Sequence, residues 1–156
     1  MISLRKIQVY EIDYFLHVLN DPETLYYMES DTAYEREDFY ATINYPKVKW
    51  YVIMNTDVEQ GIYRDPVGLF NTFIKDNKLF LGIIIDKPFR GKGYSRETFE
   101  FFLRECDKEN LDTHLSCFTD NFAYKMYKKL GYKLTGESKI IRGRKHVWMK
   151  RKANNS

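Results

Sequence analysis

The stretch that decides the fold runs from Leu79 to Ser95 and reads LFLGIIIDKPFRGKGYS. Its first half is an apolar run typical of a strand, and its second half is a basic turn that contains Gly91 and Gly93. A helix is predicted directly afterwards, over 95–109, because apolar residues recur there at a spacing of three and four. The glycines permit positive φ angles and close approach of a ligand, and the helix start offers free N–H groups. The turn therefore predicts a phosphate-binding site.

Three phosphate-binding patterns compete for this turn. A dinucleotide fingerprint needs a small residue where Arg96 stands, and a P-loop needs Gly-Lys-Ser/Thr at the end of a longer loop. The strand before the turn also follows Asp76-Asn77, which predicts a tight antiparallel hairpin that a parallel βαβ unit would lack. The pattern that remains is Arg90-x-x-Gly93-x-Ser95, with an ordinary glycine turn as its alternative.

Short strands and amphipathic helices alternate along the rest of the chain. Strands are predicted at 3–9, 50–54, 67–75, 78–85, 114–118, 132–136 and 145–150, and helices at 11–19, 34–43, 95–109 and 120–130. Asn20-Asp21-Pro22 should end the first helix, and Asp31 or Thr32 should cap the second. The segment 56–65 is a polar connection. The last two strands form a hairpin whose connection includes Arg142-Gly143-Arg144.

Composition narrows the possible classes of protein. The chain has 156 residues, 44% of them hydrophobic, which predicts one domain over 1–152 with a frayed end at 153–156. Its longest apolar run is too short to span a membrane, and no signal peptide is evident. Cys106 and Cys117 are expected to be buried reduced thiols, so a cytoplasmic location is expected. The histidines lack the spacing of metal ligands, and the net charge of +3 is too small to imply nucleic acid.

A second motif lies one strand–helix–strand unit after the first and runs from Asp120 to Tyr132 as DNFAYKMYKKLGY. The two motifs resemble the signatures of the GCN5-related N-acetyltransferases (GNAT): Gln/Arg-x-x-Gly-x-Gly/Ala, then an Asn before a helix ending in Tyr-x-x-x-Gly-Phe/Tyr. The resemblance covers 67–149. It implies an α/β (α+β) GNAT fold with a mixed, mostly antiparallel sheet, splayed fourth and fifth strands and about four helices. The branch that acetylates ribosomal-protein N-termini and polyamines is the most similar.

The resemblance implies acetyl-CoA as co-substrate and a site built from three segments. The turn Arg90-Gly91-Lys92-Gly93-Tyr94-Ser95 would hold the pyrophosphate, with charge from Arg90, Lys92 and Arg96. Unpaired backbone at Ile83, Ile84 and Ile85 would pair with the pantetheine arm. Tyr127 would be the general acid that protonates the leaving thiolate, with a packing role as its alternative.

One departure from the family pattern affects the pantetheine contact. Counted back from Gly131, the family's Asn position falls on Asp120, and Asn121 is displaced by one residue. Either residue could make the contact, and Asp120 could instead cap the helix. An aspartate can accept a hydrogen bond from an amide N–H but, when ionised, cannot donate one.

The acceptor is expected to be a cationic primary amine, such as a polyamine or a peptide N-terminus. Between residues 21 and 38 seven acids stand against the single base Arg36, and tyrosines lie among them. The resemblance places this segment beside the acceptor cleft and makes Glu29, Asp31 and Tyr34 candidate substrate contacts; a solvated helix surface is the alternative. No clear general base is predicted: His114 begins its strand and has a structural role as its alternative, and water can also carry the proton.

Two other functions stay open at this point. The protein could bind acyl-CoA without turnover. It could also be an RNA-binding module that uses a C-terminal basic cluster, although no nucleic-acid, membrane or metal partner is expected and a homodimer is left open. That cluster comprises Lys139, Arg142, Arg144, Lys145, Lys150, Arg151 and Lys152.

Overall fold

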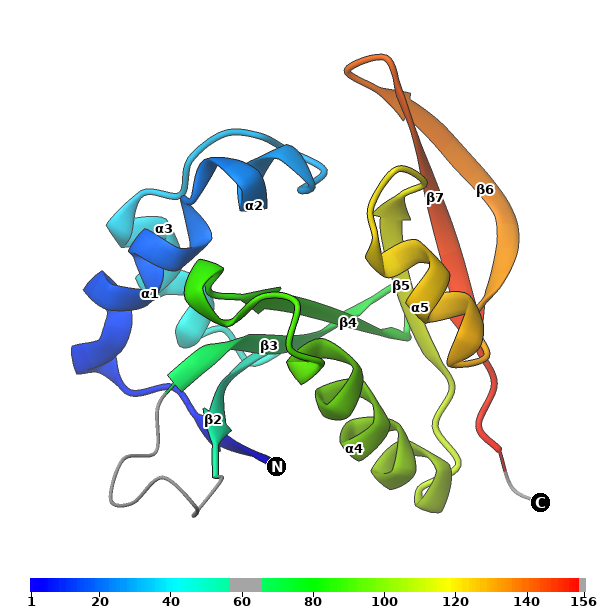
Figure 1. Cartoon of the computed structure of the whole chain (residues 1–156), viewed down its shortest axis with the longest axis horizontal. Helices are drawn as coiled ribbons and strands as arrows, with labels where there is room; N and C mark the ends of the chain where they lie inside the picture. The colour runs from blue at the N-terminus through cyan, green and yellow to red at the C-terminus, as the bar shows by residue number, and fades with distance from the viewer. Residues whose placement is uncertain (57–65, 155–156) are drawn as a thin grey trace.

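A seven-stranded sheet forms the centre of the molecule in the computed structural model, which describes residues 1–56 and 66–154 (Figure 1). Its strands lie in the order β1-β2-β3-β4-β5-β7-β6, and every neighbouring pair is antiparallel except β4 and β5. The bounds are β1 Ile2–Lys6, β2 Val48–Asn55, β3 Pro66–Lys75, β4 Lys78–Ile85, β5 Thr113–Phe118, β6 Lys133–Ile141 and β7 Arg144–Arg151. This is the mixed, mostly antiparallel sheet that the sequence predicts.

The helices cover the two faces of this sheet and enclose two cores. They are α1 Ile12–Leu19, α2 Pro22–Tyr26, α3 Arg36–Ile43, α4 Tyr94–Lys108 and α5 Ala123–Lys129, with short 3-10 helices η1 Val9–Glu11 and η3 Lys87–Phe89. Phe15 of α1 and Phe39 of α3 pack in a smaller core with β2 and β3. Phe99 of α4 and Tyr127 of α5 pack in a larger core with β3, β5 and β7. In the described part of the chain, no helix combines the length and the apolar character needed to cross a membrane.

The parallel pair β4 and β5 separates almost as soon as it forms. Phe80 and His114 are the one pair of residues in register between the two strands, whereas β4 pairs with β3 along its full length up to Ile85. The edge of β4 that faces β5 therefore has no strand partner beyond Phe80 within the described ranges. The splay of the fourth and fifth strands is confirmed. The predicted hairpin before β4 is also confirmed, because Asp76 and Asn77 both have positive φ angles.

The N-terminal helices differ from the prediction in two ways. Asn20 ends α1 as expected, but Asp21 then accepts from the Thr24 N–H and starts α2. The described residues therefore contain five α-helices, where about four were expected. Neither Asp31 nor Thr32 caps α3, which begins after Glu35. The reason is that the side chain of Asn20 bonds both the N–H and the carbonyl of Tyr34, at 2.8 and 3.0 Å, and holds that residue outside the helix.

The C-terminal hairpin is longer than predicted. Gly136 adopts a φ of 95° where the register of β6 shifts, and the strand then continues to Ile141. Its polar sequence after Gly136 hides the strand period because β6 is an exposed edge of the sheet. After β7, the N–H groups of Ala153 and Asn154 donate to Asp112 and Asp107 at 2.9 Å. Most of the predicted connection 56–65 lies outside the described residues.

Both cysteines match their expected state. Cys106 and Cys117 are free and buried. Desolvation raises the pKa of the Cys106 thiol to about 11 and that of the Cys117 thiol to about 12. Both thiols are therefore protonated and unreactive at neutral pH.

Candidate active site

The glycine turn leaves a set of backbone donors at the start of α4. Gly91 and Gly93 have φ angles of 75° and 85°, and Gly93 is the N-cap of the helix. The N–H of Glu97 donates to the carbonyl of Gly93 at 3.1 Å and is the first of the helix to do so. No backbone hydrogen bond of the described chain uses the N–H groups of residues 91–96. An anion at this position would meet several donors and the positive end of the helix dipole.

Arg90 braces the turn against α2. Its Nε donates to the carbonyl of Ile85 at 2.9 Å. Its Nη2 donates to Asp21 at 3.1 Å and to Thr24 at 3.0 Å, and its Nη1 donates to Glu23 at 3.0 Å. Two carboxylates thus neutralise a guanidinium that the sequence assigns to the pyrophosphate. These bonds hold the turn against α2.

The other cations of the turn remain near its surface. Lys92 and Arg96 are exposed, and Arg96 pairs with Glu100 at 3.0 Å one helical turn later. Tyr94 and Ser95 are half-buried at the first two positions of α4, where the Tyr94 ring packs against Phe89 with centroids 6.4 Å apart. The side chains of these residues surround the free N–H groups, whereas Gly91 and Gly93 stay exposed to solvent.

The edge of β4 continues the site from this turn toward the splay. Ile83, Ile84 and Ile85 are half-buried and pair with β3 on one side only. Ile83 packs against the larger core and Ile84 against the smaller one, so these side chains are used in packing. On the side that faces β5, the backbone N–H and carbonyl groups of these residues can pair with a ligand, because β5 has already diverged.

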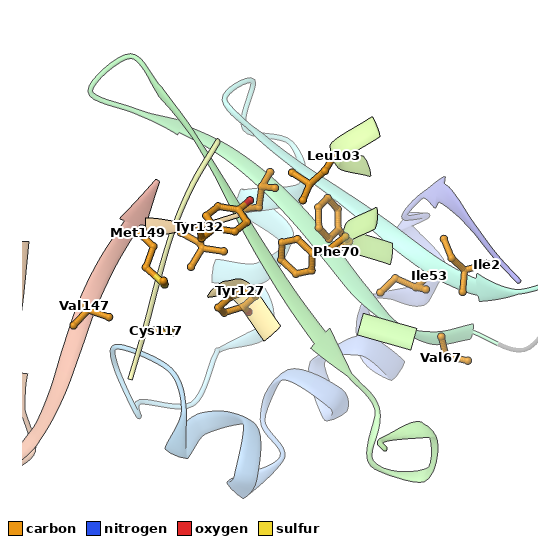
Figure 2. Close-up of a cluster of buried hydrophobic side chains, with 13 residues drawn as sticks. Ile2, Ile53, Val67, Phe70, Leu103, Cys117, Tyr127, Tyr132, Val147 and Met149 are labelled. Carbon is orange, nitrogen blue, oxygen red and sulfur yellow. The ribbon is translucent and has the colours of Figure 1, made fainter. Parts of the chain in front are cut away.

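Tyr127 lies on α5 inside the larger core (Figure 2). Its ring meets Phe99 and Tyr132 at centroid distances of 5.3 and 6.0 Å, and the side chain is 7% exposed. Burial, with a smaller contribution from Cys117, raises the pKa of the phenol well above its ordinary value. The Tyr132 hydroxyl is bonded to Thr113 at 2.7 Å, whereas no hydrogen bond between described residues engages that of Tyr127. Tyr127 therefore carries a protonated, uncommitted hydroxyl.

Asp120 and Asn121 have different partners. Both carboxylate oxygens of Asp120 accept from Arg144, at 2.8 Å each, and this ion pair holds the pKa of the carboxyl below its usual range. Asp120 does not cap α5. The N-cap position is Phe122, and just before it the Oδ1 of Asn121 accepts from the N–H of Ala123 at 2.9 Å. Each residue therefore has a structural task, and the Asn121 side-chain amide keeps an N–H₂ group that no described hydrogen bond uses.

The acidic segment between α1 and α3 is tied to the β6–β7 hairpin by two arginines. Arg142 donates to the carbonyls of Tyr26, Met28 and Glu29, and its Nε lies 3.7 Å from Asp31. Arg144 donates to the Tyr26 carbonyl at 2.6 Å and stacks over the Tyr26 ring at 3.7 Å. Figure 1 shows the end of α2 approaching the hairpin across the splayed part of the sheet. These contacts close one side of the splay.

The three residues predicted to contact the acceptor have different surroundings in the structure. Asp31 is paired with Arg142, and Tyr34 packs beside Phe39 on the smaller core. Glu29 lies near the hairpin, and its carboxylate forms no ion pair within the described residues. Counted together, Asp21, Glu23 and Asp31 are neutralised by arginines from far along the chain, so the acidic surplus is smaller than the sequence suggests.

The C-terminal basic cluster is also reduced by internal pairing. Arg142 and Arg144 bind the segment after α2, and Arg151 holds Asp107 through two hydrogen bonds at 2.8 and 3.1 Å. Lys150 lies 3.6 Å from Asp112. A surface that binds nucleic-acid phosphates needs unpaired cations, so this arrangement weakens the RNA-binding alternative.

The sequence analysis missed His146. This residue is 2% exposed in β7, directly opposite Phe118 of β5, and both of its ring nitrogens lack a hydrogen-bond partner among the described residues. Alternation along β7 places it on the same face as Arg144 and Trp148, which is the signal that could have found it. His114, the histidine that was considered, lies instead where β4 and β5 remain paired.

Two further features lie outside this site. A cavity of about 830 Å³ is lined by Lys78, His114 and Lys150 at the paired end of β4 and β5, away from the glycine turn. Within 1–56 and 66–154, no group of three or more histidine, cysteine, aspartate or glutamate side chains could hold a metal ion.

Comparison with known proteins agrees with this geometry. The family profile described as "Acetyltransferase (GNAT) domain" matches residues 29–153. No curated protein matches the chain as a relative. The spermidine N-acetyltransferase from Vibrio cholerae, solved in complex with CoA and spermine, is similar with a TM-score of 0.81 and 18% identity, over 97% of this chain and 95% of that chain.

Two ribosomal-protein acetyltransferases are also similar in structure. The ribosomal-protein-S18-alanine N-acetyltransferase from Escherichia coli has a TM-score of 0.72 and 12% identity, over 100% of this chain and 96% of that chain. The enzyme from Salmonella typhimurium that modifies the N-terminal serine of L7/L12 has a TM-score of 0.74 and 13% identity, over 98% and 95%. These identities establish a shared fold, and the profile match covers most of the chain. The chain therefore belongs to the GNAT family of N-acetyltransferases, which use acetyl-CoA as the acetyl donor.

Proposed function

We propose that this enzyme transfers an acetyl group from acetyl-CoA to a cationic primary amine by direct attack on the thioester. The observation that carries the proposal is the unpaired edge of β4 running into the free N–H groups at the start of α4. A long ligand with a pyrophosphate at one end and two amides behind it matches that sequence of donors and acceptors.

Residues of this chain take separate parts in binding the cofactor. The N–H groups of residues 91–96 bind the pyrophosphate, and Gly91 and Gly93 allow it to approach. Backbone from Ile83 to Ile85 pairs with the pantetheine, and the free amide N–H₂ of Asn121 is better suited to contact it than the Asp120 carboxylate, which Arg144 occupies. Bound acetyl-CoA supplies a thioester carbonyl that a β4 N–H group polarises as negative charge develops on its oxygen.

Tyr127 serves as the proton donor to the departing thiolate. Its pKa is raised, so the hydroxyl is fully protonated at neutral pH, but a phenolate inside this core would be costly. The tyrosine must therefore regain a proton as it gives one up. The attacking nitrogen, which loses a proton when the amide forms, is the matching source.

The charge and the aromatic rings beside the splay, on the side of α2 and the hairpin, favour a cationic acceptor. Glu29 offers an unpaired carboxylate there, and the rings of Tyr26 and Tyr27 already bind one cation, the guanidinium of Arg144. A polyamine or a basic peptide N-terminus fits these surroundings, and the similar structures named for spermidine and ribosomal-protein substrates support the same class. The two buried free thiols suit a reducing compartment, so we place the reaction in the cytoplasm.

An amine panel tests the proposal directly. Wild-type enzyme with acetyl-CoA should release CoA fastest with polyamines or basic peptides and slowly with aminoglycosides or anionic amines. Binding of acetyl-CoA measured by calorimetry without turnover of any amine would favour the acyl-CoA-binding alternative. Preference for anionic acceptors at low salt would refute the acceptor class but leave the transferase assignment intact.

A further inference from the structure

His146 occupies an unusual position for a buried polar side chain. Its ring lies between Phe118 and Trp148, at centroid distances of 4.7 and 5.0 Å. Buried side-chain nitrogens are normally hydrogen-bonded, and an unmade bond carries a free-energy cost. In the described part of the chain, Nδ1 and Nε2 of His146 are the buried side-chain polar atoms without a partner. The ring therefore carries two nitrogens without a hydrogen-bond partner at the end of β5 where β4 and β5 have separated.

The two neighbours Cys117 and Phe118 show which face each candidate residue occupies. Successive residues of a strand point to opposite faces of the sheet. Cys117 belongs to the larger core together with Tyr127, as Figure 2 shows. Phe118 lies against His146 and beneath Arg144, whose guanidinium is 3.9 Å from the ring. Tyr127 and His146 thus flank the same end of β5 from opposite sides.

Charged groups from five segments lie around His146. Glu29, between α2 and α3, favours the protonated ring. Lys139 of β6, Arg142 of the hairpin turn and Arg144 of β7 disfavour it, and Asp120 at the end of β5 is neutralised by Arg144. Burial is the largest influence and lowers the pKa of His146 below its ordinary value. The ring is neutral at pH 7 and can accept a proton.

We propose that His146 is the general base that takes the first proton from the acceptor ammonium, on the face opposite Tyr127. This inference rests on the proposed transfer to an amine. The ring is 2% exposed, so a neighbouring group must move before the acceptor reaches it. We infer that the group that moves is the segment from Tyr26 to Asp31, which Arg142 and Arg144 tie to the hairpin. The carbonyl contacts of Arg142 and Arg144 are the bonds that this movement breaks.

The proton and bond changes balance as follows. An ammonium R–NH₃⁺ gives one proton to a ring nitrogen of His146, and the resulting R–NH₂ forms a C–N bond with the thioester carbon while the C–S bond breaks. The thiolate takes a proton from Tyr127, and the nitrogen returns one to Tyr127 as the amide forms. His146 then releases its proton to water. The products are the acetamide, CoA–SH and one H⁺.

The decisive experiment compares His146→Gln with His114→Gln. Both histidines are buried in or beside β5, but His114 lies at the closed end of the splay, where its ring packs on Phe80 at 5.5 Å. With a protonated amine at pH 7, His146→Gln should lower kcat/KM roughly 100-fold or more, a typical general-base effect, and His114→Gln should have little effect. Melting temperature and acetyl-CoA affinity confirm that each variant is folded.

A second acceptor separates a base from a packing residue. An amine that is already neutral at pH 7, such as hydroxylamine, needs no base for its first proton, so its kcat/KM should fall much less in His146→Gln. Equal losses with both acceptors would refute the role of His146. Wild-type enzyme that acetylates neither amine would instead refute the proposed function.

Discussion

Replacement of Gly93 by alanine tests the phosphate-binding turn most directly. Gly93 has a φ of 85°, and a Cβ built there meets no described atom within 4 Å. The new methyl group costs roughly 1–2 kcal/mol because a residue with a side chain is strained in the left-handed region. For a chain of 156 residues that corresponds to a fall in Tm of about 2–8 °C. The protein should therefore remain folded.

The loss of cofactor affinity should be larger than this strain explains. The methyl group occupies the space through which the pyrophosphate reaches the N–H groups of residues 91–96. Loss of one hydrogen bond to a charged group costs about 1.5–3 kcal/mol, which raises the Kd of acetyl-CoA roughly 10- to 100-fold. Calorimetry measures this affinity, and differential scanning calorimetry measures the Tm.

Gly136→Ala is the matched control. Gly136 has a φ of 95°, and its Cβ also meets no described atom within 4 Å, but it lies in the bulge of β6. It should lose a similar amount of stability and bind acetyl-CoA as wild type does. Equal Kd values for the Gly93 and Gly136 variants would refute the assignment of the turn.

Three further predictions concern the chemistry and the electrostatics. Tyr127→Phe keeps the packing of the ring but removes the proton donor, so kcat should fall roughly 10- to 1000-fold with little change in acetyl-CoA affinity. If the chemical step limits the rate and kcat stays within about twofold of wild type, Tyr127 has only a packing role. The KM of a cationic acceptor should rise between low and physiological salt, because screening weakens its attraction to Glu29 and the other carboxylates, whereas the KM of a neutral amine should stay nearly constant. Burial lowers the pKa of both His114 and His146 in the folded state. Below the ordinary histidine pKa of about 6.5, the unfolded chain therefore binds protons that the folded chain does not bind. The free energy of unfolding should fall as the pH drops below that value. Denaturant titrations at pH 7 and pH 5.5 measure this loss, and it should be smaller in His146→Gln.

Local patterns in the sequence were sufficient for the sheet and for the cofactor turn. Strand alternation, helical spacing and paired glycines all act over a few residues, so β4, the turn at Gly93 and α4 follow directly from them. The start of α3 could not be predicted in the same way, because the side chain that decides it, Asn20, lies 14 residues before Tyr34. Short-range cap rules suggested Asp31 or Thr32, and a contact between helices overrode them.

Electrostatic assignments were the least predictable part of the site. A count of charges treats Arg90 as a free cation and the acids after Asn20 as a free anionic surface. The fold pairs Arg90 with Asp21, 69 residues away, and removes both from that count. His146 posed a different difficulty: alternation along its strand indicates which face it lies on, but does not indicate that its ring nitrogens lack a partner. Both features depend on long-range contacts that residue spacing does not encode.

The arginine contacts between the hairpin and the segment after α2 bear on how the enzyme folds. The bond from Arg144 to the Tyr26 carbonyl joins residues 118 apart, and that from Arg142 to Glu29 joins residues 113 apart. The strands β1 to β4 and helix α4 are synthesised before either arginine. The cofactor turn can therefore form on the ribosome while the acceptor side waits for the last strand. An intermediate that lacks the hairpin should bind the nucleotide end of acetyl-CoA before it can hold an amine.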